Sequence, residues 1–397
     1  MTGEVKRKYI KIIGGGLVGI EIAYILARNG FVVHIFNHEQ PLMCQMEKSL
    51  PFKKEMQEEL SAWNSPTYLT AKRLGVNLEN IDHDFVKIME NSLKSFPNVS
   101  FIDAEINELN LSELSLITTG NNTTKLLIDN LSKYIGENKV EYFHPAPLKL
   151  SYIDIKNLHH DHDDFYHVNL SEDEYMLLCD NLKRYRSVYD GSKLLNEISI
   201  EKRAENNSLR TFLRPIFNQG SKPYASIRLR KQDGDYILLD FYSALSDNEQ
   251  AKLIGGISAF KGANISEFGK IYKRTYLHSS ACLNKYLQVK NYHNLFVGGS
   301  FLGIGGVHEN LLVANYLAFN LMNEAEGRNL QEYPENSCTK LIIEKLLQKS
   351  VLNHMLLSLN YDIIKKNDSL LFKSEAITEF KENYYGKYFQ RNNHLRR

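Results

Sequence analysis

Three features of this 397-residue sequence predict an α/β fold. A strand, a glycine turn and a helix follow one another at the N-terminus, the same order returns near residue 294, and the residues between alternate in polarity like an antiparallel sheet. Because distant strands can complete one parallel sheet, we expect a Rossmann-like domain interrupted by an α+β insertion. The predicted bounds are 1–145 and 285–336 for the two parts of that domain, 146–284 for the insertion and 337–397 for a helical C-terminal tail.

The composition excludes several classes of protein. The 48 Lys+Arg and 47 Asp+Glu residues give a formal charge of +1, so a generic polyanion binder is not indicated and an RNA partner would need a local basic patch. The hydrophobic fraction of 43% allows buried cores, and the four cysteines form no CxxC pair that would predict a disulfide framework or a cysteine zinc site. With no uncharged apolar run of about 18 residues, we expect no membrane segment and a cytoplasmic protein.

The N-terminal residues are predicted to form a βαβ unit. A buried strand at 9–13 precedes a glycine turn, a helix at 20–29 and a second strand at 31–36. The turn contains the spacing GxGxxG, in which the first glycine makes the tight turn, the second lets a pyrophosphate approach and the third lets helix and strand pack closely. An ordinary glycine turn is the alternative, but the complete unit favours a dinucleotide at the helix N-terminus. The candidate cofactor residues here are Gly14, Gly15, Gly16, Leu17, Val18 and Gly19.

Asn37 follows the second strand, where an acidic residue normally binds the ribose hydroxyls of the dinucleotide. Its amide can hydrogen-bond a ribose but has no charge. We therefore expect an altered ribose contact at Asn37.

Further elements follow in order. Before the insertion, a charged segment at 46–75 is predicted to be helical with an interruption at Pro66, and a strand follows at 97–102. A short apolar run at 114–118 then ends at Thr119-Gly120, and a helix is predicted at 123–133. Within the insertion the elements are a helix at 173–186 and a hairpin about Gly234 formed by 224–230 and 235–241.

Two polar clusters in the insertion allow more than one interpretation. The tract from His159 to His167 contains potential metal ligands, but a solvated loop is the preferred interpretation and we expect no metal. The basic residues interleave with aromatic ones, a pattern that could follow an RNA backbone, although such charge runs are commonly solvated faces. The candidate RNA residues are Arg210, Arg214, Lys222, Tyr224 and Arg230.

A second glycine-rich segment favours FAD over NAD. A predicted strand at 294–297 is followed by Gly298, Gly299 and further glycines before a helix at 307–323. Simple NAD-binding folds do not return so late for another backbone contact with the cofactor, so we expect a Rossmann-like FAD-binding domain.

In collinear order, blocks of this sequence resemble the folate- and FAD-dependent tRNA uracil-5-methyltransferases (TrmFO), flavoproteins related to GidA. The blocks span most of the chain and lie at 12–23, 80–85, 116–120, 170–175, 222–230, 274–279 and 294–310. The resemblance implies an interrupted FAD-binding domain and transfer of a methylene unit from methylenetetrahydrofolate to carbon 5 of a uridine in tRNA or rRNA. It also implies reduction of the flavin by NADH or NADPH. The oligomeric state stays open.

The resemblance assigns further residues to the FAD site, namely Thr119, Gly120, Gly299, Gly303, Gly306 and Glu309. It also places Arg210, Lys222 and Tyr224 near the flavin and substrate face.

The catalytic cysteine of the family is replaced in this chain. The family motif Gly-Cys-Leu-Pro is Gly191-Ser192-Lys193-Leu194 here, so the family nucleophile corresponds to Ser192. A thiolate is a far better nucleophile than a serine hydroxyl that has no neighbouring base. Cys44 is a loose counterpart of the family's other cysteine. Two alternatives therefore stay open: an NAD(P)H-dependent flavin oxidoreductase without RNA activity, and a catalytically silent paralogue that binds FAD or RNA.

Overall fold

The computed structural model divides the chain into two compact units, which are described separately. The first is Met1–Val140 with Thr275–Arg397, and the second is Glu141–Arg274. The residues described are 9–38, 53–78, 81, 83–136, 139–154, 156, 158–160, 165–185, 199–215, 223–232, 234–239, 241–348, 377–378 and 380.

A parallel five-stranded sheet forms the base of the first unit. Its strands are β1 (Tyr9–Ile13), β2 (Val32–Phe36), β3 (Val99–Ile102), β4 (Ser115–Ile117) and β13 (Leu295–Val297), in the order β13-β4-β1-β2-β3. In the middle of the sheet, Ile12 pairs with Leu116 and Leu116 pairs with Phe296. All three side chains are fully buried, as expected for a parallel sheet whose faces are covered. The distant strand β13 therefore completes the sheet begun at the N-terminus.

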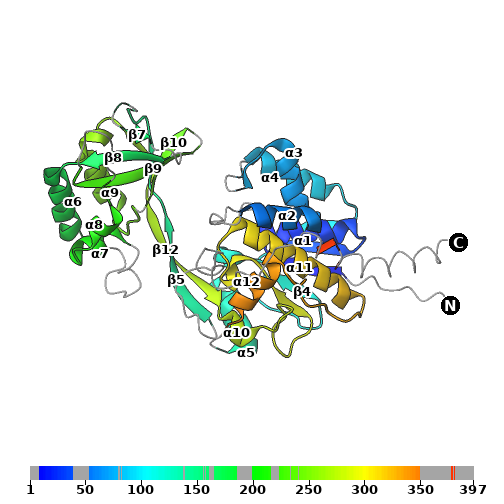
Figure 1. Cartoon of the computed structure of the whole chain (residues 1–397). Helices are drawn as coiled ribbons and strands as arrows, with labels where there is room; N and C mark the ends of the chain where they lie inside the picture. The colour runs from blue at the N-terminus through cyan, green and yellow to red at the C-terminus, as the bar shows by residue number, and fades with distance from the viewer. Residues whose placement is uncertain are drawn as a thin grey trace, which may run out of the picture. The chain divides into compact units, whose positions relative to one another are not determined.

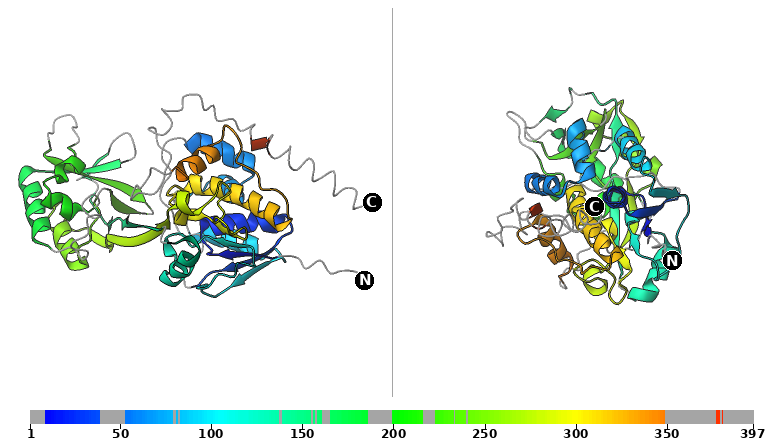
Figure 2. Two further views of the ribbon diagram at one scale, coloured as in Figure 1. Left: turned by 90° about the horizontal axis from the view of Figure 1, so that it is seen from below. Right: turned by 90° about the vertical axis from the view of Figure 1, so that its right-hand side faces the viewer.

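Several helices belong to the first unit. They are α1 (Leu17–Arg28), α2 (Lys53–Trp63), α3 (Pro66–Leu74), α4 (His83–Lys94), α5 (Lys125–Ile135), α10 (Ser279–Cys282), α11 (Val307–Ala325) and α12 (Cys338–Leu346), with short 3-10 helices η2 (Gly120–Asn122) and η6 (Gly299–Leu302). Every residue of α11 from Val307 to Asn323 is buried, and the helix contacts α1, α2 and α12 (Figure 1). The views in Figure 2 show α1 and α11 on the same side of the parallel sheet. Both helices can therefore present their N-termini to the same edge.

The break between α2 and α3 has a local cause. Ser65 is the N-cap of α3 and its hydroxyl accepts a hydrogen bond from Tyr68 N–H, while Pro66 occupies the first helical position. Gly75 ends α3 at a φ of 70°. The interruption expected at Pro66 is therefore the start of a new helix.

A six-stranded sheet with antiparallel pairing forms the second unit. Its strands are β6 (Lys149–Ser151), β7 (His159–His160), β8 (Phe165–Leu170), β9 (Ala225–Gln232), β10 (Asp235–Leu239) and β11 (Asn264–Glu267), in the order β11-β6-β10-β9-β8-β7. The predicted hairpin is present, with Gly234 at a φ of 91° between β9 and β10. The helices of this unit are α6 (Glu172–Arg184), α7 (Ile200–Glu205), α8 (Leu209–Phe212), α9 (Asp247–Gly255) and the 3-10 helix η5 (Ser258–Phe260).

A two-stranded ribbon joins the units along the chain. It pairs β5 (Lys139–Ala146) with β12 (Lys270–Leu277), and both unit boundaries fall inside these strands. This is why the observed unit bounds differ from the predicted insertion bounds of 146–284. Across the described ranges, no helix combines the length and apolar character needed to cross a membrane.

Candidate cofactor site and substrate pocket

The carboxyl ends of β1 and β4 are joined through Gly14. This residue has a φ of 107°, and a Cβ there would lie 2.7 Å from the backbone of Thr118 and Thr119. Thr118 Oγ1 donates a hydrogen bond of 2.8 Å to the Gly14 carbonyl. Only a glycine permits this close approach, and Thr118 is a supporting residue that the sequence prediction did not include.

Gly16 and Gly19 differ in how much space the structure leaves for a side chain. A Cβ on Gly19 would lie 2.1 Å from the Gly14 carbonyl oxygen, so the packing of α1 on the turn excludes any side chain. A Cβ on Gly16 would make only an ordinary 3.7 Å contact with Thr118 O. Gly16 is the N-cap of α1 and supplies no side-chain cap, which leaves the first-turn N–H groups directed at whatever lies beyond the helix.

Asn37 supports the glycine turn from the end of β2. Its Oδ1 accepts a hydrogen bond of 2.9 Å from Gly15 N–H. Asn37 therefore helps to hold the backbone of the glycine turn at Gly15, and the ribose contact predicted for its amide stays a prediction.

Two further glycines lie beside this turn. Gly120 has a φ of 55°, and a Cβ there would lie 2.7 Å from Ser300 Oγ. Gly299 has a φ of 77°, and its Cβ position lies 3.7 Å from the buried side chain of Val18. Thr119 Oγ1 lies 2.6 Å from Thr123 Oγ1. The segments after β4 and β13 thus lie against the start of α1.

The start of α11 is occupied by its own carboxylate. Gly306 is the N-cap of α11, and a Cβ there would lie 1.9 Å from Glu309 Oε2, so the buried Glu309 folds back over the N-cap. Gly303 has a φ of 91°, and its Cβ position is 3.0 Å from the ring of Tyr276. The positive φ and the adjacent Tyr276 ring favour glycine at Gly303, whereas at Gly306 the nearest atoms belong to the end of the Glu309 side chain.

Glu21 connects the two helices whose N-termini lie at this edge. Its buried carboxylate accepts hydrogen bonds from Ser65 Oγ at 2.6 Å, Thr67 N–H at 3.0 Å and Asn315 Nδ2 at 2.8 Å. Burial raises the pKa of Glu21, and the three donors oppose that shift. The contacts fix α1 against the start of α3 and against α11.

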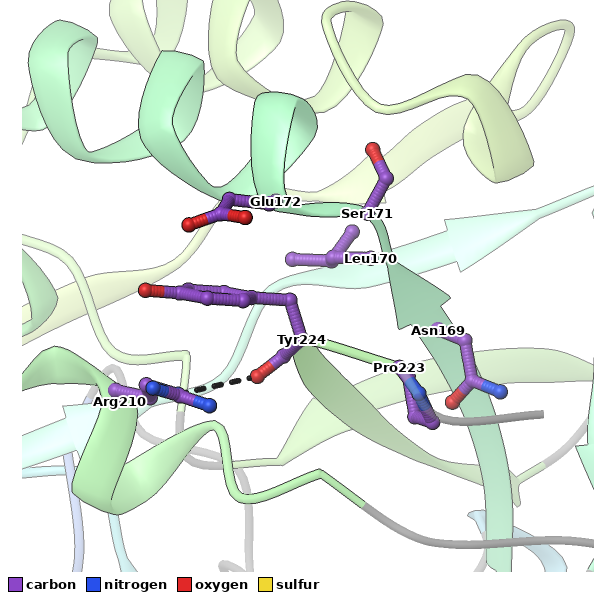
Figure 3. Close-up of a pocket in the computed structure, with 7 residues that line it drawn as sticks. All are labelled: Asn169, Leu170, Ser171, Glu172, Arg210, Pro223 and Tyr224. Atoms are coloured by element: carbon purple, nitrogen blue, oxygen red, sulfur yellow. Dashed lines mark hydrogen bonds between the residues drawn. The ribbon is translucent and has the colours of Figure 1, made fainter.

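A pocket of about 500 Å³ lies in the second unit (Figure 3). The Arg210 guanidinium carbon lies 4.0 Å from the centroid of the Tyr224 ring, and Arg210 Nε donates a 3.2 Å hydrogen bond to the Tyr224 carbonyl. The Tyr224 ring in turn contacts Tyr175, with 5.1 Å between ring centroids. The lining residues are Asn169, Leu170, Ser171, Glu172, Arg210, Pro223 and Tyr224.

The other candidate substrate residues are not part of this lining. Arg214 is exposed, and its Nε donates a 2.9 Å hydrogen bond to Thr211 O. Arg230 is half-buried on β9 next to the core residue Leu229, and burial lowers its pKa. Lys222, together with the catalytic candidates Cys44 and Ser192, lies outside the described residues.

The cysteines in the described part of the chain are buried free thiols. Burial raises the pKa of Cys282 to about 11 and also raises the pKa values of Cys179 and Cys338. These three side chains therefore lack the accessible thiolate that a nucleophile requires. No group of three metal-ligating side chains occurs among the residues whose structure is described.

Comparison with known proteins agrees with this architecture. The family model for glucose inhibited division protein A matches residues 9–140 and 122–329. The methylenetetrahydrofolate–tRNA-(uracil-5-)-methyltransferase TrmFO 1 of Mycoplasma mycoides subsp. mycoides is 27% identical over 379 residues, which cover 86% of this chain and 88% of that protein. The TrmFO of Thermosipho africanus is 25% identical over 395 residues, which cover 87% and 91%.

The solved structure of Aquifex aeolicus GidA in its form II crystal has the same fold. It aligns with a TM-score of 0.67 at 14% sequence identity and covers 94% of this chain and 72% of that chain. The α/β fold class predicted from sequence is confirmed. The motif resemblance to GidA-related proteins is also confirmed, and the chain belongs to the glucose inhibited division protein A family.

Proposed function

We propose that this chain is an FAD-dependent RNA (uracil-5-)-methyltransferase that takes its one-carbon unit from methylenetetrahydrofolate. The names of the relatives at 27% and 25% identity support this reaction and favour tRNA as the substrate, with rRNA as the alternative target. NADH or NADPH is the proposed reductant. The arrangement that supports cofactor binding best is the N-terminus of α1, where packing allows a side chain at Gly16 but the chain has none.

The residues at this edge fit a dinucleotide. Backbone N–H groups of Gly16, Leu17 and Val18 would hold the pyrophosphate, and the positive end of the α1 dipole would stabilise its charge. Gly120 and Gly299 would allow the cofactor to approach the backbone after β4 and β13. A bound and reduced FAD would supply the two electrons that convert a methylene unit to a methyl group.

The nucleophile of the proposed reaction has to differ from that of the family. Uracil is normally activated by addition of a thiolate, and Ser192 replaces the family cysteine. The buried cysteines have raised pKa values, so Cys44 is the remaining sulfur candidate. This replacement favours the second candidate function, a flavin oxidoreductase or silent paralogue that retains the fold without methylating RNA.

The test has two stages. We expect the purified protein to show flavin absorbance and to transfer label from methylenetetrahydrofolate to an unmodified tRNA transcript in the presence of NADH or NADPH. Bound, reducible FAD without label in tRNA or rRNA would exclude methyl transfer and support the oxidoreductase. A colourless protein that does not bind added FAD would support the silent paralogue.

Ser192→Cys tests whether the family geometry is retained around this position. If Ser192 occupies the place of the family nucleophile, the variant should methylate at least about tenfold faster, because a thiolate replaces a weak hydroxyl nucleophile. Ser187→Cys, a serine-to-cysteine change five residues earlier in the sequence, is the control for nonspecific thiol reactivity.

A further inference from the structure

The pocket of the second unit places two opposite charges about one aromatic ring. Figure 3 shows Arg210 on one side of the Tyr224 ring and Glu172 on the other. Within the part of the chain that the structure describes, neither charged side chain has an ion-pair partner. The pocket therefore presents a cation and an anion that no side chain of the described residues neutralises in an ion pair.

Arg210 is held in a fixed orientation before a ligand arrives. Its guanidinium carbon lies 4.0 Å from the centroid of the Tyr224 ring, and its Nε donates a 3.2 Å hydrogen bond to the Tyr224 carbonyl. The terminal N–H groups form a planar fork that suits two oxygens of one anion. Because the side chain is already ordered, binding such an anion loses less conformational entropy.

Glu172 is not needed to cap its helix. The N-terminus of α6 is capped by Ser171 and Glu174, whose side chains and backbone N–H groups bond reciprocally. Glu172 is exposed in the first turn, where its carboxylate can accept a hydrogen bond from a ligand hydroxyl. Nearby, Asn169 Oδ1 accepts from Ser226 Oγ at 2.8 Å, which leaves the Asn169 amide hydrogens as donors.

A ligand for this pocket needs one negative charge and a neighbouring hydroxyl donor. A phosphodiester-linked ribonucleotide has both, in its phosphate and its 2′-hydroxyl. A deoxyribonucleotide lacks the hydroxyl, and a folate polyglutamate could offer a carboxylate to Arg210 but has no ribose hydroxyl for Glu172.

We propose that this pocket binds one ribonucleotide of an RNA chain, with Arg210 on its phosphate and Glu172 on its 2′-hydroxyl. This inference rests on the proposed RNA substrate and names the residues that distinguish RNA from DNA. Arg210 would supply affinity, and Glu172 would supply the preference for ribose.

Binding of labelled oligouridylate, and of the 2′-deoxy oligomer of the same length, to the full chain tests the proposal. Arg210→Gln should weaken oligouridylate binding about tenfold and reduce the salt slope by about 0.7, the value for one phosphate of a single strand. Lys252→Gln, an exposed charge change on α9, is the matched control and should have a small effect. Glu172→Ala should lower the RNA-to-DNA affinity ratio about fivefold, whereas Asp173→Ala should leave this ratio unchanged.

The outcomes separate this inference from the proposed function. Equal losses in Arg210→Gln and Lys252→Gln, or an unchanged RNA-to-DNA ratio in Glu172→Ala, would overturn the ribonucleotide pocket even if the enzyme methylates RNA. Displacement of oligouridylate by folate polyglutamate that depends on Arg210 would also overturn it and identify a folate subsite. Binding that depends on Arg210 and Glu172 in a protein without methyl transfer would uphold the pocket and exclude the methyltransferase.

Discussion

Alanine substitutions at Gly16 and Gly19 should distinguish cofactor binding from packing, because each substitution adds one methyl group at a different kind of position. Alanine at Gly19 would place Cβ 2.1 Å from Gly14 O, whereas an ordinary contact begins at 3.4 Å, so backbone atoms would have to separate by about 1.3 Å (3.4 − 2.1). Neither partner is a flexible side chain. We expect Gly19→Ala to lower the free energy of unfolding by about 3 kcal/mol or more.

Gly16→Ala should have the opposite effect, with a small loss of stability and a large loss of FAD affinity. Its Cβ would lie 3.7 Å from Thr118 O, an ordinary contact, so the folded chain should lose only about 1 kcal/mol from the poorer N-cap. The same methyl would stand where a pyrophosphate approaches α1. Loss of about 3 kcal/mol of charge-assisted hydrogen bonding corresponds to about a hundredfold weaker binding of FAD.

Urea unfolding followed by circular dichroism measures the first quantity, and quenching of flavin fluorescence on titration measures the second. Gly16→Ala with wild-type affinity for FAD would refute the placement of the pyrophosphate at the N-terminus of α1. Gly19→Ala with wild-type stability would refute the close contact between α1 and the glycine turn.

Three further predictions concern polar side chains in the two units. Burial raises the pKa of Glu201 from 4.5 to about 6. The contribution of Glu201 to the free energy of unfolding should therefore be complete below pH 4.5 and fall by about 2 kcal/mol as the pH rises through 6. Glu201→Gln should remove this step from the pH dependence of urea unfolding. Glu21→Ala should lower the free energy of unfolding by at least about 3 kcal/mol, because three buried donors lose their acceptor, and a loss below 1 kcal/mol by the same method would contradict the assigned contacts. Asn37→Ala should cost about 1 kcal/mol and weaken FAD binding, because Gly15 N–H loses its partner, whereas unchanged calorimetric binding would show that the turn needs no support from Asn37.

Local chemistry made the N-terminal βαβ unit predictable from sequence. The N-terminal strand, turn and helix are contiguous, and their apolar and glycine residues specify a βαβ unit without reference to the rest of the chain. The ribbon of β5 and β12 was not predicted, because its two strands pair across the whole insertion and neither has a turn signal that identifies its partner. The role of Asn37 was also missed, since a residue that ends a strand can bind a ligand or the neighbouring turn.

Proximity along the chain was a poor guide to which residues line the pocket of the second unit. Arg210 and Tyr224 come together from α8 and the start of β9, but Arg214 and Arg230 do not join the pocket lining. Alternation along β9 separates Arg230 from Leu229, whose side chain is in the core of the unit. Glu172 could have been found from sequence only by recognising that Ser171 and Glu174 already form a capping box and leave the residue between them available.

The glycines also bear on whether this chain is an enzyme or a silent paralogue. Gly14 and Gly19 are required for folding, because any side chain would meet backbone atoms, so a silent protein of this fold would need them as well. Folding does not require a glycine at position 16, because a serine or asparagine side chain could cap α1 there and satisfy one of its N–H groups. A ligand at the helix N-terminus explains the missing cap, since a capping side chain would compete with the pyrophosphate for the same donors. The uncapped N-terminus of α1 at Gly16 thus supports FAD binding, because packing alone does not require a glycine there. Methyl transfer depends on a nucleophile, and Ser192 stands at the position of the family nucleophile.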